Sequence, residues 1–217
     1  MTQPNGCREN PLPMSLQQLD PPTRALLAFA AAIARGDAGE LAVFGRACAE
    51  ARVSALWMDE LLLQSVLMVG WPRALTAFAA WRVLAPPAAG GEDGGDYDLA
   101  ESWRARGEAV CREVYGKNYA ALRDKIRSFH PSLEAWMITE GYGKTIGRPG
   151  LDLARRELCV SVQVAVQGAE PQLHSHLKGA RHAGTSDAAI SEALELVRPQ
   201  LGPREAELAF ALWSRIR

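Results

Sequence analysis

Apolar positions in the first third of this chain recur at the spacing of helices and do not alternate as they would in a strand. The segment 24–35 is rich in alanine and leucine, and Gly36 is placed to end it as a C-cap glycine. Ser54 is a candidate N-cap for a later helix, which Gly70 would end. The pattern predicts four helices here, at about 24–35, 39–52, 54–70 and 72–81.

The same pattern returns 132 residues further along the chain, without an insertion. Residues 19–81 align with 151–213 at 16 identities in 63 positions. Two glycines of the first copy, Gly36 and Gly70, align with glycines of the second, so the turns that they mark are in register as well as the helices. Neither copy contains a credible strand. The chain is therefore an internal duplication of one small helical unit.

The sequence between the two copies resembles neither of them. Residues 85–98 (APPAAGGEDGGDYD) are expected to form a flexible linker. Helices are expected at 99–115, 117–129 and 132–142, followed by a glycine-rich turn at 143–150. No Rossmann or P-loop signature occurs, so the chain is expected to be all-α. The predicted organisation is a disordered tail at 1–14, a first repeat at 15–84, the linker at 85–98, connecting helices with the glycine-rich turn at 99–150, and a second repeat at 151–217.

Composition narrows the classes of function. A content of 48% hydrophobic and 23% charged residues is typical of a soluble globular protein. The net charge of −1 argues against a nucleic-acid binder, which would need a basic face. The longest uncharged apolar run, 25–34, is too short to span a bilayer, and 1–13 lacks the apolar core of a signal peptide. The four cysteines are scattered without a C-x-x-C pair, so we expect no disulfides and a cytoplasmic location.

Several segments carry a resemblance to a known family. They read REVYG at 112–116, YGKTIGRPGLD at 142–152, QLHSHLKGARHAG at 172–184 and, in the first copy, ELLLQS at 60–65 with GWPRALTAF at 70–78. Together they resemble the motifs of the carboxymuconolactone decarboxylase family, whose members share the all-helical AhpD-like fold. The resemblance covers most of the chain beyond residue 18. It implies an all-α, AhpD-like fold that is internally duplicated here.

The resemblance also implies a site. His176 takes the position of the family's active-site histidine, and histidine suits proton transfer because its pKa lies near neutrality. Arg148 would bind a substrate carboxylate, with a surface arginine that caps the turn as an equal alternative. Glu60 is a third catalytic candidate, but the second copy keeps it as Glu192, which suits a structural role at least as well. The substrate-binding candidates are Lys144, Tyr142, Trp71, Phe78 and Leu62.

The two copies keep different halves of the family motif. The second copy keeps the front half, since the first has Phe44 in place of His176 and Leu16 in place of Arg148. The first copy keeps the back half, because Arg204 replaces Pro72 in the second. This division predicts one composite site per chain, built from both copies.

The resemblance implies a cofactor-free lyase similar to 4-carboxymuconolactone decarboxylase, acting on a small carboxylated lactone or unsaturated cyclic acid. The alternative is a diverged, non-catalytic small-molecule-binding protein of the same fold, which is favoured by Lys144 because the family commonly has an acidic residue there. AhpD-type thiol reduction is disfavoured because the C-x-x-C pair is absent. A metal site is disfavoured because His174 and His176 lie on different sides of a helix.

The expected partners are a small carboxylic acid or lactone and further copies of this chain, with no nucleic acid and no membrane. Single-copy family members form rings of paired subunits. Because each chain here supplies two units, we expect a trimer that resembles a hexamer of single copies.

Overall fold

The computed structural model describes residues 16–217, so the tail predicted at 1–14 lies outside the described residues. As predicted, this part of the chain is all-α, and it contains only one isolated bridge, between Leu16 and Thr185. The elements in order are α1 (Pro21–Arg35), α2 (Ala38–Glu50), α3 (Ala55–Arg82), η1 (Tyr97–Leu99), α4 (Ala100–Tyr115), η2 (Gly116–Asn118), α5 (Tyr119–Phe129), α6 (Pro131–Trp136), the π-helical η3 (Met137–Ile146), α7 (Leu153–Val166), α8 (Glu170–His182), α9 (Asp187–Val197), η4 (Arg198–Gln200) and α10 (Pro203–Ile216).

The duplication is visible in the helix caps. Asp20 caps α1 and Asp152 caps α7 in the same way, since each carboxylate accepts from the backbone N–H three residues later. Ser54 and Ser186 cap α3 and α9 in the same way. At Gly70 the backbone leaves helical geometry (φ 74°, ψ 168°), so α3 is two helices joined at a kink. The second copy has α9 and α10 at the matching places, and the four predicted helices per copy are confirmed.

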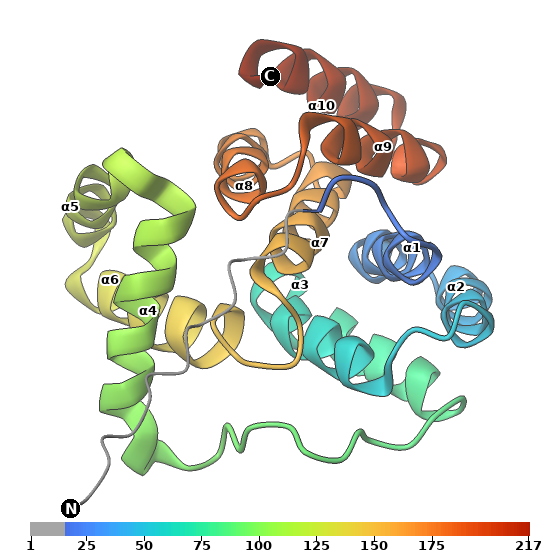
Figure 1. Cartoon of the computed structure of the whole chain (residues 1–217), viewed down its shortest axis with the longest axis horizontal. Helices are drawn as coiled ribbons and strands as arrows, with labels where there is room; N and C mark the ends of the chain where they lie inside the picture. The colour runs from blue at the N-terminus through green and yellow to red at the C-terminus, as the bar shows by residue number, and fades with distance from the viewer. Residues whose placement is uncertain (1–15) are drawn as a thin grey trace, which may run out of the picture.

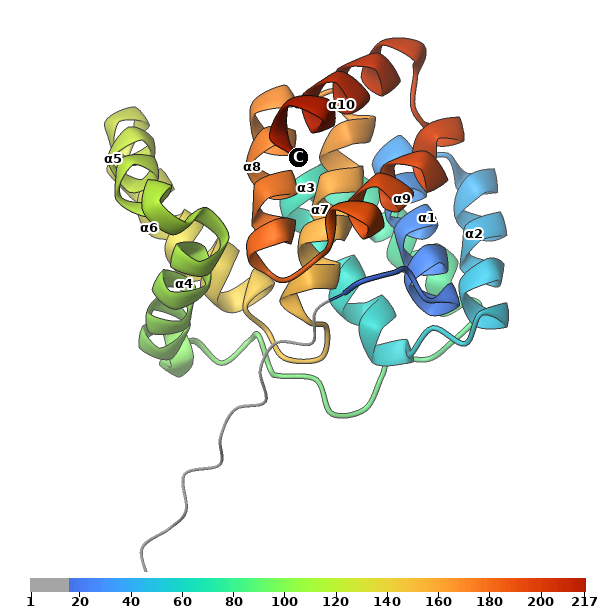
Figure 2. The same ribbon diagram turned by 45° about the horizontal axis from the view of Figure 1, so that its top comes forward.

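Helices α1 and α7 form the centre of the body, with α2, α3, α8, α9 and α10 packed around them (Figures 1 and 2). Most side chains of both central helices are buried, including Phe29 and Ile33 on α1 and Leu158 and Val162 on α7. A helix that is apolar on nearly all sides belongs in the interior of a fold. Each copy therefore contributes one helix to a shared core.

Two ion pairs cross between the copies in equivalent positions. Arg156 of the second copy pairs with Glu60 of the first, at 2.7 Å between Nη2 and Oε2. Arg24 of the first copy pairs with Glu192 of the second. The Nε atoms of both arginines also donate to equivalent carbonyls, those of Leu151 and Leu19. The copies are thus joined by a reciprocal Arg–Glu exchange.

Helices α4, α5 and α6 project to one side of the body as an arm (Figures 1 and 2). Its base is the close packing of α4 against η3. A Cβ atom on Gly107 would overlap the Ile138 carbonyl, and one on Gly143 would overlap that of Trp103. The prediction of a glycine-rich turn at 143–150 is therefore wrong for its first part, because η3 continues to Ile146. Gly143 is present to let two helices approach, and it does not form a turn.

The segment 85–98 runs along one edge of the body and joins it to the arm (Figure 1). The backbone N–H of Ala88 donates to Asp59 Oδ2 at 2.8 Å. Both carboxylate oxygens of Glu92 accept from Arg106, at 2.7 and 2.8 Å. This linker is held at two points along its length.

Among the described helices, α3 is long and apolar enough to cross a membrane by length and composition alone, with 33% of its most apolar window buried. It packs against α1, α2 and α7, as core helices of globular proteins do. Such a helix is weak evidence for a membrane span.

Candidate functional site

Two consecutive charged residues on α7, Arg156 and Glu157, are fully buried and lead to two separate polar clusters. Successive helical residues point about 100° apart. Arg156 reaches Glu60 and Gln64 on α3, whereas Glu157 reaches His176 on α8. Because buried charges require partners, each cluster needs a structural or chemical explanation.

The first cluster is a carboxylate–imidazole pair. Glu157 Oε2 lies 2.9 Å from Nδ1 of His176, and the whole His176 residue is 7% exposed. Gly179, three residues later on α8, makes room for the carboxylate, since a Cβ atom there would overlap Oε2. Within the described part of the chain, the other imidazole nitrogen has no hydrogen-bond partner. When Nδ1–H donates to Glu157, Nε2 is left available to exchange a proton.

Two tyrosines lie beside this pair. The Tyr142 hydroxyl donates to the Tyr115 hydroxyl at 3.1 Å, and the two rings meet edge to face. Burial raises the pKa of Tyr115 to about 12, and the charge of Glu157 acts in the same direction. Burial also raises the pKa of Tyr142 well above its ordinary value, assisted by Tyr115 and Glu157. Both phenols therefore stay neutral at physiological pH and act as hydrogen-bonding groups.

The second cluster centres on Glu60, which is 1% exposed. Its carboxylate accepts from Nε of Arg148 at 3.0 and 3.2 Å and from Nη2 of Arg156 at 2.7 Å. Arg148 Nη2 also donates to the Glu92 carbonyl at 2.7 Å. Burial lowers the pKa of Arg156, and the bond to Glu60 opposes that shift. The buried Glu60 carboxylate thus accepts hydrogen bonds from two guanidinium groups. These bonds connect α3 with α7 and with the turn before α7.

A pocket of about 460 Å³ lies next to Arg148, between α3, η3 and the segment 85–98. Three sequence-predicted residues, Arg148, Lys144 and Trp71, line it together. Lys144 Nζ donates to the Tyr97 hydroxyl at 2.8 Å and lies 3.6 Å from Glu140. Trp71 is 67% exposed, so it forms an outer wall. The pocket combines an apolar wall from α3 with two cations and three acidic residues, Glu92, Asp93 and Glu140.

The other predicted site residues lie elsewhere. His176 and Glu60 do not line this pocket. Leu62 is a fully buried core residue, and Tyr142 is buried beside Tyr115. Phe78 is half-buried, and the guanidinium carbon Cζ of Arg82 lies over its ring, 5.7 Å from the ring centroid. The structure therefore divides the predicted set, with Arg148 and Lys144 in one place and His176 in another.

Sequence reasoning missed Glu157. Its position in the first copy is occupied by Ala25, and that of His176 by Phe44. The joint loss of an acid and a histidine from one copy was the available signal. It becomes decisive only when the two side chains are known to touch.

Metal and thiol chemistry find little support among the described residues. No group of three or more His, Cys, Asp or Glu residues placed to hold a metal ion occurs there. Cys48, Cys111 and Cys159 are free and buried, and burial raises the pKa of Cys48 and of Cys111 to about 12. Such thiols are inert at neutral pH because the reactive species is the thiolate.

The comparison with protein families settles the family. The Carboxymuconolactone decarboxylase family matches residues 14–83 and 131–214, which together are well over half of the chain. This chain belongs to the carboxymuconolactone decarboxylase family. The two matched regions correspond to the two copies, so it is a two-repeat member of the family. No curated protein matches the chain.

The matched regions assign the candidate residues to the two copies. Glu60 and Trp71 lie in the first region, whereas Arg148, Glu157 and His176 lie in the second. The second region also includes α6 and η3. Helices α4 and α5 fall between the two matched regions.

Proposed function

We propose that this chain is a cofactor-free acid–base enzyme that removes carbon dioxide from a small carboxylated lactone or unsaturated cyclic acid, as 4-carboxymuconolactone decarboxylase does. The observation that carries the proposal is the buried contact between Glu157 and His176. Family membership supports the fold, and the pair supplies the group that such a reaction needs.

The reaction requires one proton to be delivered to carbon. When the bond to the carboxylate carbon breaks, its electron pair moves toward the lactone carbonyl and gives an enolate, and carbon dioxide leaves. Protonation of the enolate carbon then completes the step. A protonated His176 donates this proton from Nε2, while its Nδ1–H stays bonded to Glu157. A positioned acid of this kind contributes roughly 10²–10⁴-fold to the rate.

Glu157 has two tasks in this scheme. It fixes the ring orientation and the tautomer through Nδ1, and its negative charge stabilises the imidazolium form. It does not contact the substrate, so it is a positioning residue. The tyrosine pair beside it adds no charge, because both phenols are neutral at physiological pH.

A second candidate function is the binding of a small organic anion without chemistry. It is favoured by the pocket at Arg148, where Lys144 and Trp71 are present but the acid–base pair is not. Part of the positive charge of Arg148 is already neutralised by Glu60. Such a pocket can hold a carboxylate beside Lys144 without transforming it.

Turnover of 4-carboxymuconolactone in D₂O separates these functions. The enzyme proposal predicts release of carbon dioxide and one solvent deuterium on the product carbon next to the lactone carbonyl. His176→Phe, which reproduces Phe44 of the first copy, should abolish both. His130→Asn is the matched control, since His130 caps α6 on the outer arm and asparagine also caps helices. Binding of the lactone by the wild-type chain without any product would favour the second function.

A further inference from the structure

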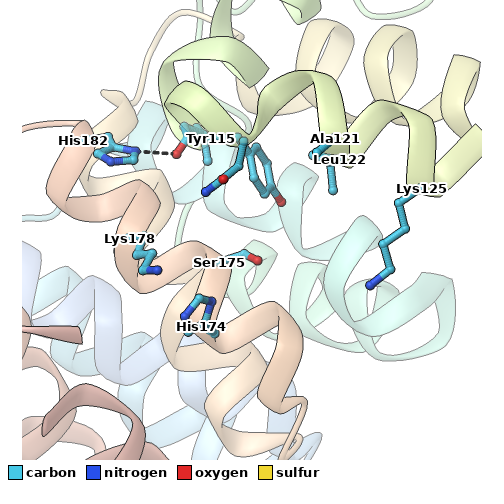
Figure 3. Close-up of a pocket in the computed structure, with 10 residues that line it drawn as sticks. Tyr115, Ala121, Leu122, Lys125, His174, Ser175, Lys178 and His182 are labelled. Carbon is cyan, nitrogen blue, oxygen red and sulfur yellow. Dashed lines mark hydrogen bonds between the residues drawn. The ribbon is translucent and has the colours of Figure 1, made fainter. Parts of the chain in front are cut away.

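A second pocket, of about 230 Å³, lies between α5 and α8, at the end of α4 (Figure 3). On α8 it is lined by His174, Ser175, Lys178 and His182, whereas His176 turns inward to Glu157. Neither Glu157 nor His176 lines the pocket, although Tyr115 lies beside both the pocket and the pair. This pocket lies away from the pocket at Arg148, with which it shares no residue.

The lining of this pocket is cationic. Lys125 from α5 and Lys178 from α8 face it from opposite sides, and no acidic residue lines it (Figure 3). Within the described chain, neither lysine forms an ion pair or a side-chain hydrogen bond. The nearby Arg215 is paired with Glu170, at 3.4 Å. Two unneutralised ammonium groups on the walls of one cavity attract an anion.

The pKa of His174 gives independent support for an uncompensated positive field. Burial lowers the pKa of His174, and the charges of Lys178 and Arg215 lower it further, against a raising effect of Glu170. The neutral form of His174 is therefore favoured next to the lysines. Nδ1 of His182 lies 2.7 Å from the Val114 carbonyl oxygen, so this contact holds α8 against α4 at one side of the pocket.

The rest of the lining is apolar and aromatic. Val114, Ala121, Leu122 and the Tyr115 ring make up this part, on the arm side. A cavity of about 150 Å³ can hold benzene, so 230 Å³ leaves room for a six-membered ring that carries polar groups. An inorganic anion would use the lysines and leave the apolar surface uncovered.

We propose that this pocket binds a small aromatic or cyclic dicarboxylate, with its ring against Leu122 and Tyr115 and its carboxylates on Lys125 and Lys178. The site goes beyond the proposed function, because it uses the outer face of α8 and requires no turnover. In this proposal α4 and α5, which lie outside the matched family regions, form part of a binding site.

Isothermal titration calorimetry of the full chain tests this with three probes. Benzene-1,3-dicarboxylate should bind at one site per chain. Its uncharged diamide and inorganic phosphate should each bind at least about tenfold more weakly, because each lacks one of the two interactions. Lys125→Met and Lys178→Met should each weaken the dicarboxylate about tenfold, which is typical for loss of one charge-assisted contact.

Two further variants separate a pocket from a diffuse positive surface. Arg46→Met removes the same charge from an exposed position on α2, remote from the pocket, and should leave the affinity unchanged. Ala121→Phe fills the apolar part without changing the charge and should abolish binding, with the circular dichroism spectrum unaltered. Equal weakening by Arg46→Met, unchanged binding in Ala121→Phe, or phosphate binding as tight as that of the dicarboxylate would each overturn the proposal.

Discussion

Glu157 Oε2 on α7 and His176 Nδ1 on α8 lie 2.9 Å apart in the interior of the second copy. The first copy cannot make this contact, because it has Ala25 and Phe44 at the matching positions. Of the two copies, as far as residues 16–217 show, only the second therefore contains this carboxylate–imidazole pair. The first copy holds α7 from another side, through the ion pair between Glu60 on α3 and Arg156.

The reciprocal Arg–Glu pairs provide a matched test of stability. Glu60→Gln leaves two buried guanidinium groups without their shared carboxylate and should cost about 3–5 kcal/mol. Glu192→Gln breaks the equivalent pair where the Arg24 side chain is 52% exposed, and should cost at most about 1 kcal/mol. Urea unfolding of both variants measures the difference. Equal losses of unfolding free energy in the two variants would show that Glu60 is not the electrostatic centre of the fold.

The contact between α4 and η3 depends on two glycines. Gly107→Ala should destabilise the chain by about 1–3 kcal/mol or more, since the added methyl group overlaps the Ile138 carbonyl. Gly141→Ala, on η3, is the control, because its Cβ would meet nothing closer than 3.8 Å. Thermal unfolding compares them. A Gly107→Ala variant as stable as Gly141→Ala would contradict the close packing.

The buried thiols should be unreactive at neutral pH. Burial raises the pKa of Cys48 from 9.0 to about 12, so the native thiol stays protonated at neutral pH. Its contribution to stability is complete below pH 9 and is lost as the pH rises toward 12. Replacement of all four cysteines by alanine should leave any turnover largely intact. Loss of turnover with an unaltered fold would revive the thiol mechanism.

We predict that copies of the chain associate through an apolar stripe on α3. It comprises Leu63, Leu67, Trp71 and Leu75, at every fourth residue, and each of these side chains is at least 38% exposed. Exposed apolar stripes of this kind mark interaction surfaces. We predict a trimer by light scattering, and Leu75→Arg should shift it to smaller species. A wild-type chain that is monomeric at all concentrations would refute the prediction.

Much of the fold was predictable because it depends on local chemistry. The Asp20 and Asp152 caps, the serine caps and the kink at Gly70 all act within a few residues of chain. The prediction failed at 143–146, where Gly143 faces Trp103 on another helix. No local rule distinguishes a glycine that forms a turn from one that admits a neighbouring helix.

The site was less predictable, because it depends on which side chains meet. Arg148 was predicted either to bind a substrate carboxylate or, equally, to cap the turn at the surface. In the structure it is buried, and the Glu60 carboxylate and the Glu92 carbonyl occupy much of its guanidinium. Glu157 was overlooked because a charged residue in a helix usually faces solvent. On α7, which is buried on nearly all sides, it faces His176 instead.

A double-mutant cycle on kcat/KM for 4-carboxymuconolactone tests the central claim most directly. Residues that act as one catalytic unit give effects that do not add. We predict a loss of about 10²-fold or more for His176→Phe and a smaller loss for Glu157→Gln. The double variant should be no slower than His176→Phe alone. Full activity in His176→Phe with a native fold, or losses that multiply in the double variant, would contradict the account.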